Sequence, residues 1–196
     1  MRILIVGATG TIGKAIAEGL GSKHDLLLAS HSKAPLAVDI ASPQSIQALY
    51  RKAGRLDAVI SAAGQARFKP FAQLTDDDYA FSLANKLMGQ VNLVRYGMDA
   101  LNDRGSFTLT SGVLATSPMV GSGVISLVNA GLEGFTRAAA LEATRGIRVN
   151  IVSPPWVTET LKAYGMPLDG GLPASTVANT YIGLLDSKTT GQTVSP

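Results

Sequence analysis

Short apolar runs alternate with longer segments of helical periodicity along the whole chain. Several runs are apolar at every position, as at residues 26–28 and 58–60. This pattern is typical of parallel strands that helices cover on both faces. The sequence predicts seven strands, at residues 2–6, 25–29, 37–39, 57–61, 106–110 and 148–152 and near Thr193.

The segments between these strands predict helices. Ser42 before Pro43 is a typical N-cap followed by proline in the first turn, and Thr75 precedes three aspartates that suit a helix N-terminus. The predicted helices span residues 11–20, 43–52, 84–101, 122–144 and 173–185, with a short one after Thr75. Strands that alternate with helices build βαβ units, so we expect the α/β class: a three-layer, doubly wound parallel sheet, or Rossmann fold, of about seven strands.

Length and composition narrow the protein class. The chain has 196 residues, which suits a single domain over residues 1–196. The Pro- and Gly-rich stretch 154–173 predicts a short substrate loop inside the last βα unit. The absence of cysteine excludes disulfides and thiolate metal sites. Neither His24 nor His31 has the neighbours that a metal site needs, so we expect no metal.

Charge and hydropathy give no indication of a macromolecular partner. The chain has 17 Lys and Arg against 14 Asp and Glu, a net charge of +3, without a basic block. We therefore expect neither a nucleic-acid nor a membrane partner. No apolar run reaches the roughly 20 residues of a membrane span. The N-terminus passes from a strand to glycines without the cleavage site of a signal peptide, so we expect a cytoplasmic protein.

A glycine-rich turn, GATGTIG at residues 7–13, joins the first strand to the first helix. A turn in this position brings backbone N–H groups and the positive end of a helix dipole to one point, and the glycines allow a ligand to approach closely. A pyrophosphate is the ligand we expect, and the alternative is a tight turn without a ligand. The residues predicted to hold it are Gly7, Thr9, Gly10, Thr11, Ile12 and Gly13.

The end of the second strand indicates which dinucleotide is bound. An acid there would accept hydrogen bonds from a free ribose 2′-hydroxyl and repel a 2′-phosphate. The sequence instead has Ser30, His31 and Ser32, followed by Lys33, all of which can donate hydrogen bonds. We therefore predict NADP(H) over NAD(H), with ordinary solvated turn residues as the alternative.

Three segments resemble the short-chain dehydrogenase/reductase superfamily: the glycine turn, SAAG at residues 61–64 and IRVNIVSP at residues 147–154. The resemblance covers nearly the whole chain. The GxxGxxG spacing is nearer to the extended and atypical branches of that family than to the GxxxGxG of its main branch. The resemblance implies an oxidoreductase that transfers a hydride between a nicotinamide cofactor and a small carbonyl or alcohol substrate.

The resemblance also implies further cofactor contacts. Members hold adenine with an acid and its neighbour after the third strand, adenosine with the SAAG-like stretch, and the carboxamide and pyrophosphate with the segment after the sixth strand. By position, the residues implied here are Asp39, Ile40, Ala62, Ala63, Gly64, Pro154, Val157 and Thr158.

The family's catalytic set matches this chain only in part. In the family, a Tyr is the general acid/base, and a Lys four residues later lowers its pKa and holds the nicotinamide ribose. A Ser after the fifth strand orients the carbonyl, and an Asn in the preceding long helix supports a water. Ser111 matches the serine, and Asn85 is the candidate for the asparagine to within one residue of register, with a solvated helix residue as the alternative.

The Tyr and Lys are replaced. NAGLEGFTR at residues 129–137 resembles the family's KAALEGFTR, so Asn129 stands where the Lys belongs and Ile125 where the Tyr belongs. Isoleucine cannot transfer a proton, and asparagine can hydrogen-bond the ribose but carries no charge. Three alternatives stay open: an atypical reductase that takes its proton from Ser111, water or Tyr164; a catalytically silent NADP(H)-binding sensor or regulatory protein; and an enzyme of another class.

The two long predicted helices, at residues 84–101 and 122–144, carry small residues on more than one face. In the family these helices pair across a two-fold axis and form a four-helix interface. We therefore expect a homodimer or homotetramer. The alternative is that the alanines only allow the helices to pack closely on the sheet.

Overall fold

The computed structural model describes residues 1–196 and contains one sheet of seven parallel strands. The strands are β1 (Arg2–Val6), β2 (Asp25–Ser30), β3 (Leu36–Ala37), β4 (Leu56–Ser61), β5 (Leu101–Thr110), β6 (Arg148–Val152) and β7 (Thr193–Val194). Their order is β3-β2-β1-β4-β5-β6-β7, so β2 and β3 extend the sheet on one side of β1 and β4 to β7 extend it on the other. Such a reversal creates a crevice at the carboxyl ends of the central strands.

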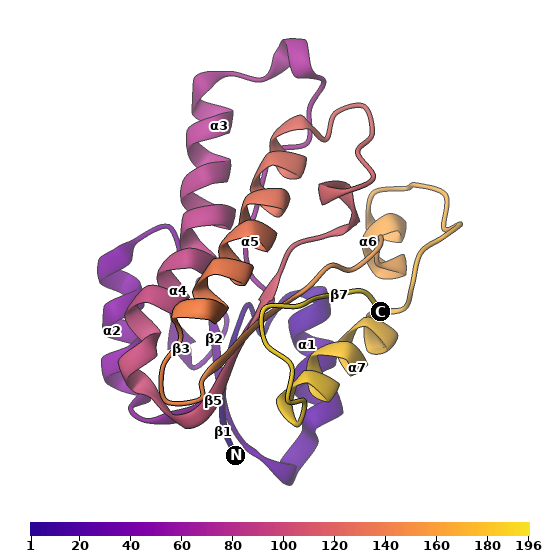
Figure 1. Cartoon of the computed structure of the whole chain (residues 1–196). Coiled ribbons are helices and arrows are strands. Elements are labelled where there is room, and N and C mark those ends of the chain that lie inside the picture. The colour runs from indigo at the N-terminus through magenta and orange to yellow at the C-terminus, as the bar shows by residue number, and fades with distance from the viewer.

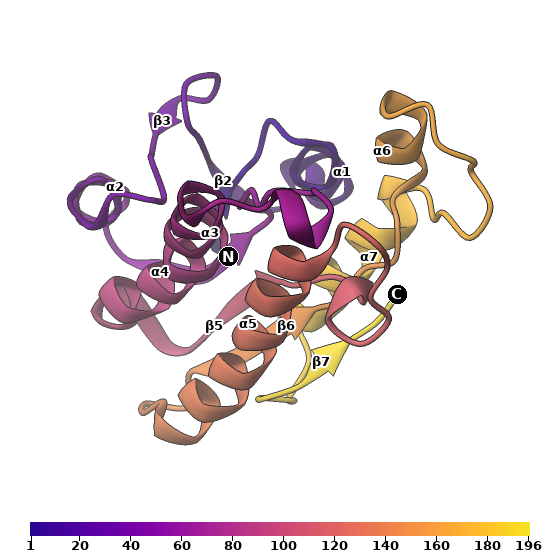
Figure 2. The ribbon, with the colours of Figure 1, turned by 90° about the horizontal axis from the view of Figure 1, so that it is seen from above.

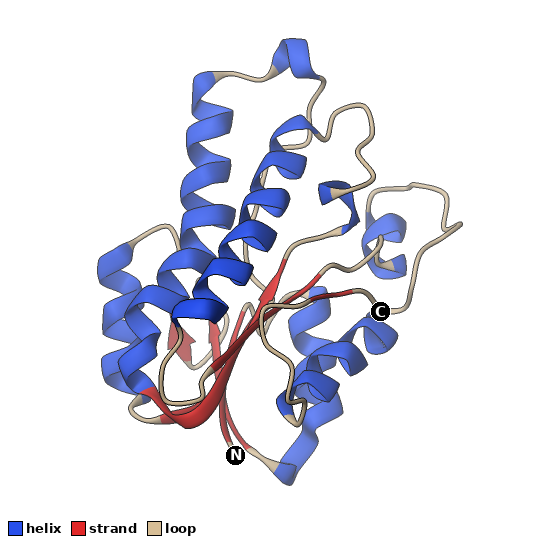
Figure 3. Ribbon diagram, in the orientation of Figure 1, coloured by secondary structure: helices blue, strands red, loops and turns tan.

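Helices cover both faces of this sheet, as Figures 1 and 2 show. The α-helices are α1 (Thr11–Leu20), α2 (Pro43–Ala53), α3 (Asp76–Ser82), α4 (Gly89–Gly97), α5 (Gly123–Glu142), α6 (Thr158–Ala163) and α7 (Ala174–Leu185). One apolar core lies under α2, α4 and α5, and includes Leu49, Leu93 and Leu132. A second lies under α1 and α7, and includes Ile16 and Tyr181. The predicted three-layer, doubly wound α/β fold is confirmed (Figure 3).

Two predicted helix starts are confirmed by their hydrogen bonds. Ser42 caps α2 by accepting a hydrogen bond from the Ser45 N–H at 3.2 Å, with proline in the first turn. Thr75 caps α3 in a capping box, in which its side chain and that of Asp78 each accept from the other's backbone N–H. Local capping chemistry therefore determines where both helices begin.

The predicted helix at 84–101 is wrong at both ends. A helical path begins earlier, at α3, and passes through a π-helical turn at Leu83–Met88 into α4, followed by a short 3₁₀ turn. Leu101 belongs to β5 because it pairs with Leu56 of β4. The strand predicted at 106–110 is therefore longer, because β5 already begins at Leu101. A register shift and a left-handed Arg104 interrupt its first half, which hides the strand pattern in the sequence.

Two other predictions need correction. The strand predicted at 37–39 is Leu36–Ala37, and Asp39 lies outside it because its carboxylate accepts a hydrogen bond from the Ala41 N–H in a turn. The stretch 154–173, predicted as a loop, contains α6. None of the helices is long and apolar enough to cross a membrane.

We predict opposite stability changes for two helical glycines. A Cβ at Gly97 would overlap the ring of Tyr50, which is buried and whose hydroxyl donates to the Leu93 carbonyl at 2.6 Å. Gly97→Ala should therefore lower the free energy of unfolding by about 1–3 kcal/mol. Gly183 of α7 faces open space, so Gly183→Ala should raise it by about 0.5–1 kcal/mol. Urea unfolding measures both, and equal effects would contradict the packing at Gly97.

Self-association stays a prediction. Leu127 and Leu141 of α5 are 49% and 90% exposed, so the helix presents apolar side chains to solvent. Light scattering at micromolar concentration is expected to give at least twice the monomer mass. A monomer at that concentration would contradict the prediction.

Candidate functional site

A cavity of about 940 Å³ lies at the carboxyl ends of the central strands. It is lined by residues that directly follow β4, β5 and β6, together with Ile12 of α1 and Ile125 and Asn129 of α5. A smaller hollow of about 490 Å³ lies against the start of α1 and includes Thr9, Gly10 and Thr11. The two hollows therefore meet the sheet where the strand order reverses.

The glycine turn packs its backbone directly against the end of β4. A Cβ at Gly7, which has a φ of 87°, would lie 2.6 Å from the Ala62 carbonyl oxygen, and one at Gly13 would overlap the Gly7 carbonyl. Gly10 is the N-cap of α1, which has neither a side-chain cap nor an acid in its first turn. The first N–H groups of α1 are thus left for an anion, as a pyrophosphate requires.

The end of β2 contains no acid. Ser30 is buried and its hydroxyl accepts a hydrogen bond from the Lys33 N–H at 3.0 Å, while His31 and Ser32 are exposed on the same turn. These are the side chains predicted to bind a 2′-phosphate. Ile40, predicted to contact adenine, is 7% exposed.

The hydroxyl of Ser111 binds a residue that does not line the cavity. The Ser111 hydroxyl is buried and donates to Oε1 of Glu133 on α5 at 2.8 Å. A Cβ at Gly112 would instead lie 3.1 Å from Nδ2 of Asn129. The Cβ position next to Asn129 is therefore that of residue 112, a glycine, whereas the Ser111 hydroxyl reaches Glu133, one turn further along α5. This geometry argues against the predicted role of Ser111 as the group that orients a carbonyl.

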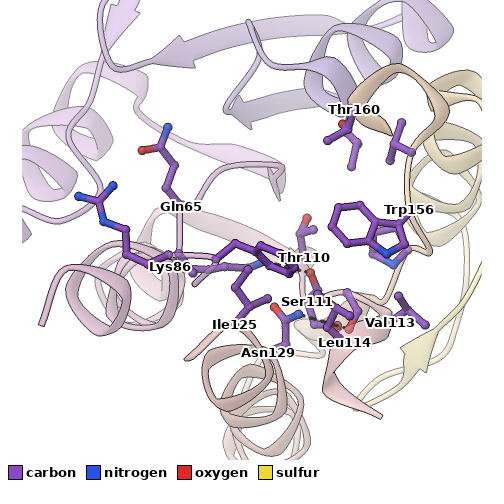
Figure 4. Close-up of a pocket in the computed structure, with 18 of the residues that line it drawn as sticks. Gln65, Lys86, Thr110, Ser111, Val113, Leu114, Ile125, Asn129, Trp156 and Thr160 are labelled. Carbon is purple, nitrogen blue, oxygen red and sulfur yellow. Dashed lines mark hydrogen bonds between the residues drawn. The ribbon is translucent and has the colours of Figure 1, made fainter. Parts of the chain in front are cut away.

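Asn129 lies at the floor of the cavity. Its Nδ2 donates to the Gly112 carbonyl at 3.3 Å, and its buried Oδ1 has no hydrogen-bond partner. A buried, unpaired amide oxygen is costly, so it favours a ligand hydroxyl or N–H at this point. Ile125, one helical turn earlier, also lines the cavity (Figure 4).

Lys86 is a site residue that the sequence analysis missed. It lies on the π-helical turn, lines the cavity, and donates from Nζ to the Ser111 carbonyl at 3.2 Å (Figure 4). Burial lowers the pKa of Lys86 to about 8. The predicted Asn85 does not line the cavity, and its Oδ1 accepts from the Gln65 N–H at 2.7 Å. A lysine within the otherwise uncharged stretch LANKLM was the signal available in the sequence.

A polar clamp fixes the end of β5. The amide of Gln90, on α4, donates to the Thr110 carbonyl and accepts from the Thr110 N–H, both at 2.8 Å. The Thr110 hydroxyl donates to the Ser61 carbonyl at 2.6 Å and lies 2.7 Å from the Tyr181 hydroxyl. Burial raises the pKa of Tyr181, so its phenol stays protonated. The strand end that carries residues 111 and 112 is therefore held from both faces of the sheet.

The segment after β6 covers one side of the cavity. Backbone hydrogen bonds of 2.9 Å join Thr158 and Trp156 to Leu172, so both ends of this segment are pinned together. Both carboxylate oxygens of Glu159 on α6 accept from the Ala174 N–H, at 3.1 and 3.0 Å, which caps α7. The rings of Trp156 and Phe68 pack edge to face, with their centroids 6.4 Å apart.

The predicted site residues divide into three groups. The large cavity is lined by Ile12, Ala62, Ala63, Gly64, Ser111, Ile125, Asn129, Pro154 and Val157. The smaller hollow is lined by Thr9, Gly10 and Thr11. The residues outside both are Gly7, Gly13, Ser30, His31, Ser32, Asp39, Ile40, Asn85 and Thr158. The roles of all of them stay predictions. No group of three or more His, Cys, Asp or Glu side chains is placed to hold a metal ion.

Comparison with known proteins decides the family. The family model described as enoyl-(acyl carrier protein) reductase matches residues 7–191. The chain belongs to the short-chain dehydrogenase/reductase family. This is a family of oxidoreductases that bind a nicotinamide cofactor, so the resemblance seen in the sequence is confirmed.

Curated relatives match this short-chain dehydrogenase/reductase over different shares of their own lengths. Hydroxynaphthalene reductase arp2 of Aspergillus fumigatus is 33% identical over 57% of this chain, which spans 41% of that protein. A 3-oxoacyl-[acyl-carrier-protein] reductase of Bos taurus is 27% identical over 95% of this chain and 81% of its own length.

Solved structures match over nearly the whole chain. The protein lin1944 of Listeria innocua has a TM-score of 0.95 and 37% identity, over 100% of this chain and 98% of its own. A small-chain dehydrogenase in complex with NADPH has a TM-score of 0.89 and 26% identity, over 99% of this chain and 95% of its own.

We predict that Ser111→Ala acts on stability rather than on proton transfer. The substitution removes the hydrogen-bond donor of the buried Glu133, so the free energy of unfolding should fall by about 1–3 kcal/mol. Ser117→Ala, at an exposed position, should change it by less than about 0.5 kcal/mol. Urea unfolding and turnover are measured on the same samples. Abolished turnover at unchanged stability would restore Ser111 to the predicted catalytic role.

Proposed function

We propose that the protein is an NADP(H)-dependent oxidoreductase that reduces or oxidises a small carbonyl or alcohol substrate by hydride transfer. The cavity carries this proposal, because it extends from Ile12 beside the glycine turn to Lys86 and Asn129 at the end of β5. A dinucleotide seated along the first part would present its nicotinamide to the second. Family membership supports the same reaction class.

The residues present fit such a cofactor. The free N–H groups at the start of α1 suit a pyrophosphate, and the glycines let the turn that carries them pack directly against the end of β4. The unpaired Oδ1 of Asn129 suits a ribose hydroxyl, and Pro154 and Val157 line the cavity where the carboxamide would lie. When bound, the nicotinamide supplies or accepts the hydride. The protein's part is to bind and orient both reactants and to manage the proton.

The preference for NADP(H) rests on the end of β2. Ser30, His31 and Ser32 offer hydrogen-bond donors, and no acid is present to repel a 2′-phosphate. A related small-chain dehydrogenase has been solved with NADPH, which supports the proposal.

The segment at about 154–173 is proposed as the substrate loop of this single domain. Its Trp156 and the facing Phe68 form an apolar wall of the cavity. A wall of two aromatic rings favours a substrate with an apolar body. The pinned ends at residues 156–158 and 172 limit movement to the segment between them.

The second candidate function is a catalytically silent NADP(H)-binding sensor or regulatory protein. The observation that favours it is the pair Ile125 and Asn129, which lines the cavity without the phenol and amine of the family. Incubation with NADPH and a panel of aldehydes, ketones and quinones separates the two functions. Turnover of any member supports the enzyme; tight binding of NADPH without turnover supports the sensor.

We predict that an acid at the end of β2 reverses the cofactor preference. The unmodified protein should bind NADPH at least about tenfold tighter than NADH. His31→Asp should weaken NADPH binding by about tenfold or more and leave NADH binding unchanged or improved, because the carboxylate repels the 2′-phosphate. His24→Asp, at the opposite end of β2, changes the charge equally and should have no effect. Titration calorimetry measures the affinities of all three proteins for both cofactors, and equal or tighter NADH binding by the unmodified protein would contradict the prediction.

A further inference from the structure

We propose that Lys86 is the proton donor of this site: its Nζ gives a proton to the substrate oxygen during reduction and takes one back during oxidation. The inference rests on the proposed oxidoreductase function and deepens it. It assigns the acid/base role to a side chain on the helical segment before β5, whereas in the family that role belongs to a residue of α5.

The local backbone directs the side chain of Lys86 toward the cavity. The π-helical turn Leu83–Met88 interrupts the α-helix at Lys86, and such turns are frequent at functional sites. The stem of Lys86 passes over Gly64, where a Cβ would lie 3.0 Å from its Cγ. Gly64 therefore leaves the space through which the amine reaches the cavity. Nearby, Asn85 and Ser82 accept hydrogen bonds from the N–H groups of Gln65 and Arg67, which ties the segment after β4 to this helix.

The amine is held but not neutralised. The amine donates a hydrogen bond to the Ser111 carbonyl at 3.2 Å, and it forms no ion pair. An ammonium group has three N–H bonds, so two stay available to a ligand. A substrate oxygen beside the end of β5 would therefore meet a positioned donor.

No charged side chain around the cavity forms an ion pair with the amine of Lys86. Arg67 and Lys69, from the segment after β4, both pair with Asp78, at 3.6 and 2.8 Å. Glu133 of α5 accepts a hydrogen bond from the Ser111 hydroxyl, and Tyr164 is 72% exposed. No Asp, Glu or His lines the cavity. Burial is thus what lowers the pKa of Lys86 to about 8, close to the pH at which a general acid/base works best.

The other candidate donors lack one requirement each. Ile125 has no proton to give, and the amide of Asn129 does not ionise. The Ser111 hydroxyl is engaged as a hydrogen-bond donor to Glu133, and Lys69 donates hydrogen bonds to both carboxylate oxygens of Asp78. Tyr164 sits on an exposed turn after α6. Lys86 alone combines a place in the cavity, free N–H bonds and a lowered pKa.

The step balances with the groups named. As the carbonyl carbon gains a hydride, the C=O π electrons move to oxygen, and the oxygen forms a bond to a proton of Lys86. The N–H bond breaks and its electron pair stays on Nζ, which becomes a neutral amine. Water at the cavity mouth then returns a proton to Nζ. In oxidation each transfer runs in reverse, and neutral Lys86 accepts the alcohol proton.

The protonation state gives opposite pH profiles for the two directions. Reduction needs protonated Lys86, so its rate should be constant at low pH and fall as the pH rises through about 8. Oxidation needs the neutral amine, so its rate should rise with pH and level off above about 8. Both limbs should disappear in Lys86→Met.

The test compares Lys86→Met, Lys86→Arg and the control Lys52→Met, which removes an exposed lysine of α2. Lys86→Met should lower kcat for reduction by about 10²–10⁴-fold while NADPH binding changes by less than about threefold. Lys86→Arg keeps the charge but does not release a proton near neutral pH, so it should not restore kcat. Lys52→Met should match the unmodified protein.

A second readout does not depend on activity. Acetylation of single lysines by acetic anhydride is followed against pH by peptide mass spectrometry on the unmodified, cofactor-free protein. The rate at Lys86 should rise with a midpoint near 8, well below the pKa of about 10.4 of a lysine in a model peptide.

The outcomes separate this inference from the proposed function. If the unmodified protein turns over a substrate and Lys86→Met does so at the same rate and pH profile, the inference fails and the proposed function stands. A Lys86 midpoint near 10.4, or restored kcat in Lys86→Arg, also overturns the inference. If the unmodified protein binds NADPH but converts nothing, the proposed function fails and the inference falls with it.

Discussion

The close approach of the glycine turn to the end of β4 determines where everything else in the site can lie. Gly7 and Gly13 have no room for a side chain, because Ala62 and the turn itself occupy that space. This contact brings β1, the start of α1 and the end of β4 together where the strand order reverses. The uncapped N-terminus of α1 then faces the crevice, and the segments after β4, β5 and β6 form its walls. A side chain at either glycine would separate these elements.

Much of the fold was predictable because it depends on local patterns. Buried strands, capped helix starts and the glycine turn each leave a signal within a few residues, as Ser42 and Thr75 illustrate. The first half of β5 was not predictable, because a register shift interrupts the strand pattern of its residues. Leu101 is identified as a strand residue only by its pairing with Leu56 of β4. The π-helical turn and α6 were missed for a similar reason: helical periodicity does not distinguish a π turn from an α turn, and α6 spans only Thr158–Ala163.

At two places in the candidate site, the residue that follows the predicted one has a position or a chemistry that the sequence did not indicate. After the end of β5, the Ser111 hydroxyl binds Glu133, whereas the Cβ position of Gly112 lies next to Asn129. On the helical segment, the same displacement directs Asn85 to a backbone N–H and Lys86 into the cavity. The site therefore contains an amine and an amide, as the family resemblance implies, but on exchanged helices: the amine precedes β5 and the amide lies on α5.

The amine of Lys86 is oriented by the carbonyl of residue 111, which is part of the main chain. Any amino acid at this position supplies the same acceptor, so the side chain of Ser111 is free to serve the interior through Glu133. Selection on the side chain of residue 111 is therefore independent of selection on its backbone geometry. Substitutions at position 111 among relatives would reflect packing against α5, and would not indicate whether the lysine keeps its hydrogen bond to the carbonyl of residue 111.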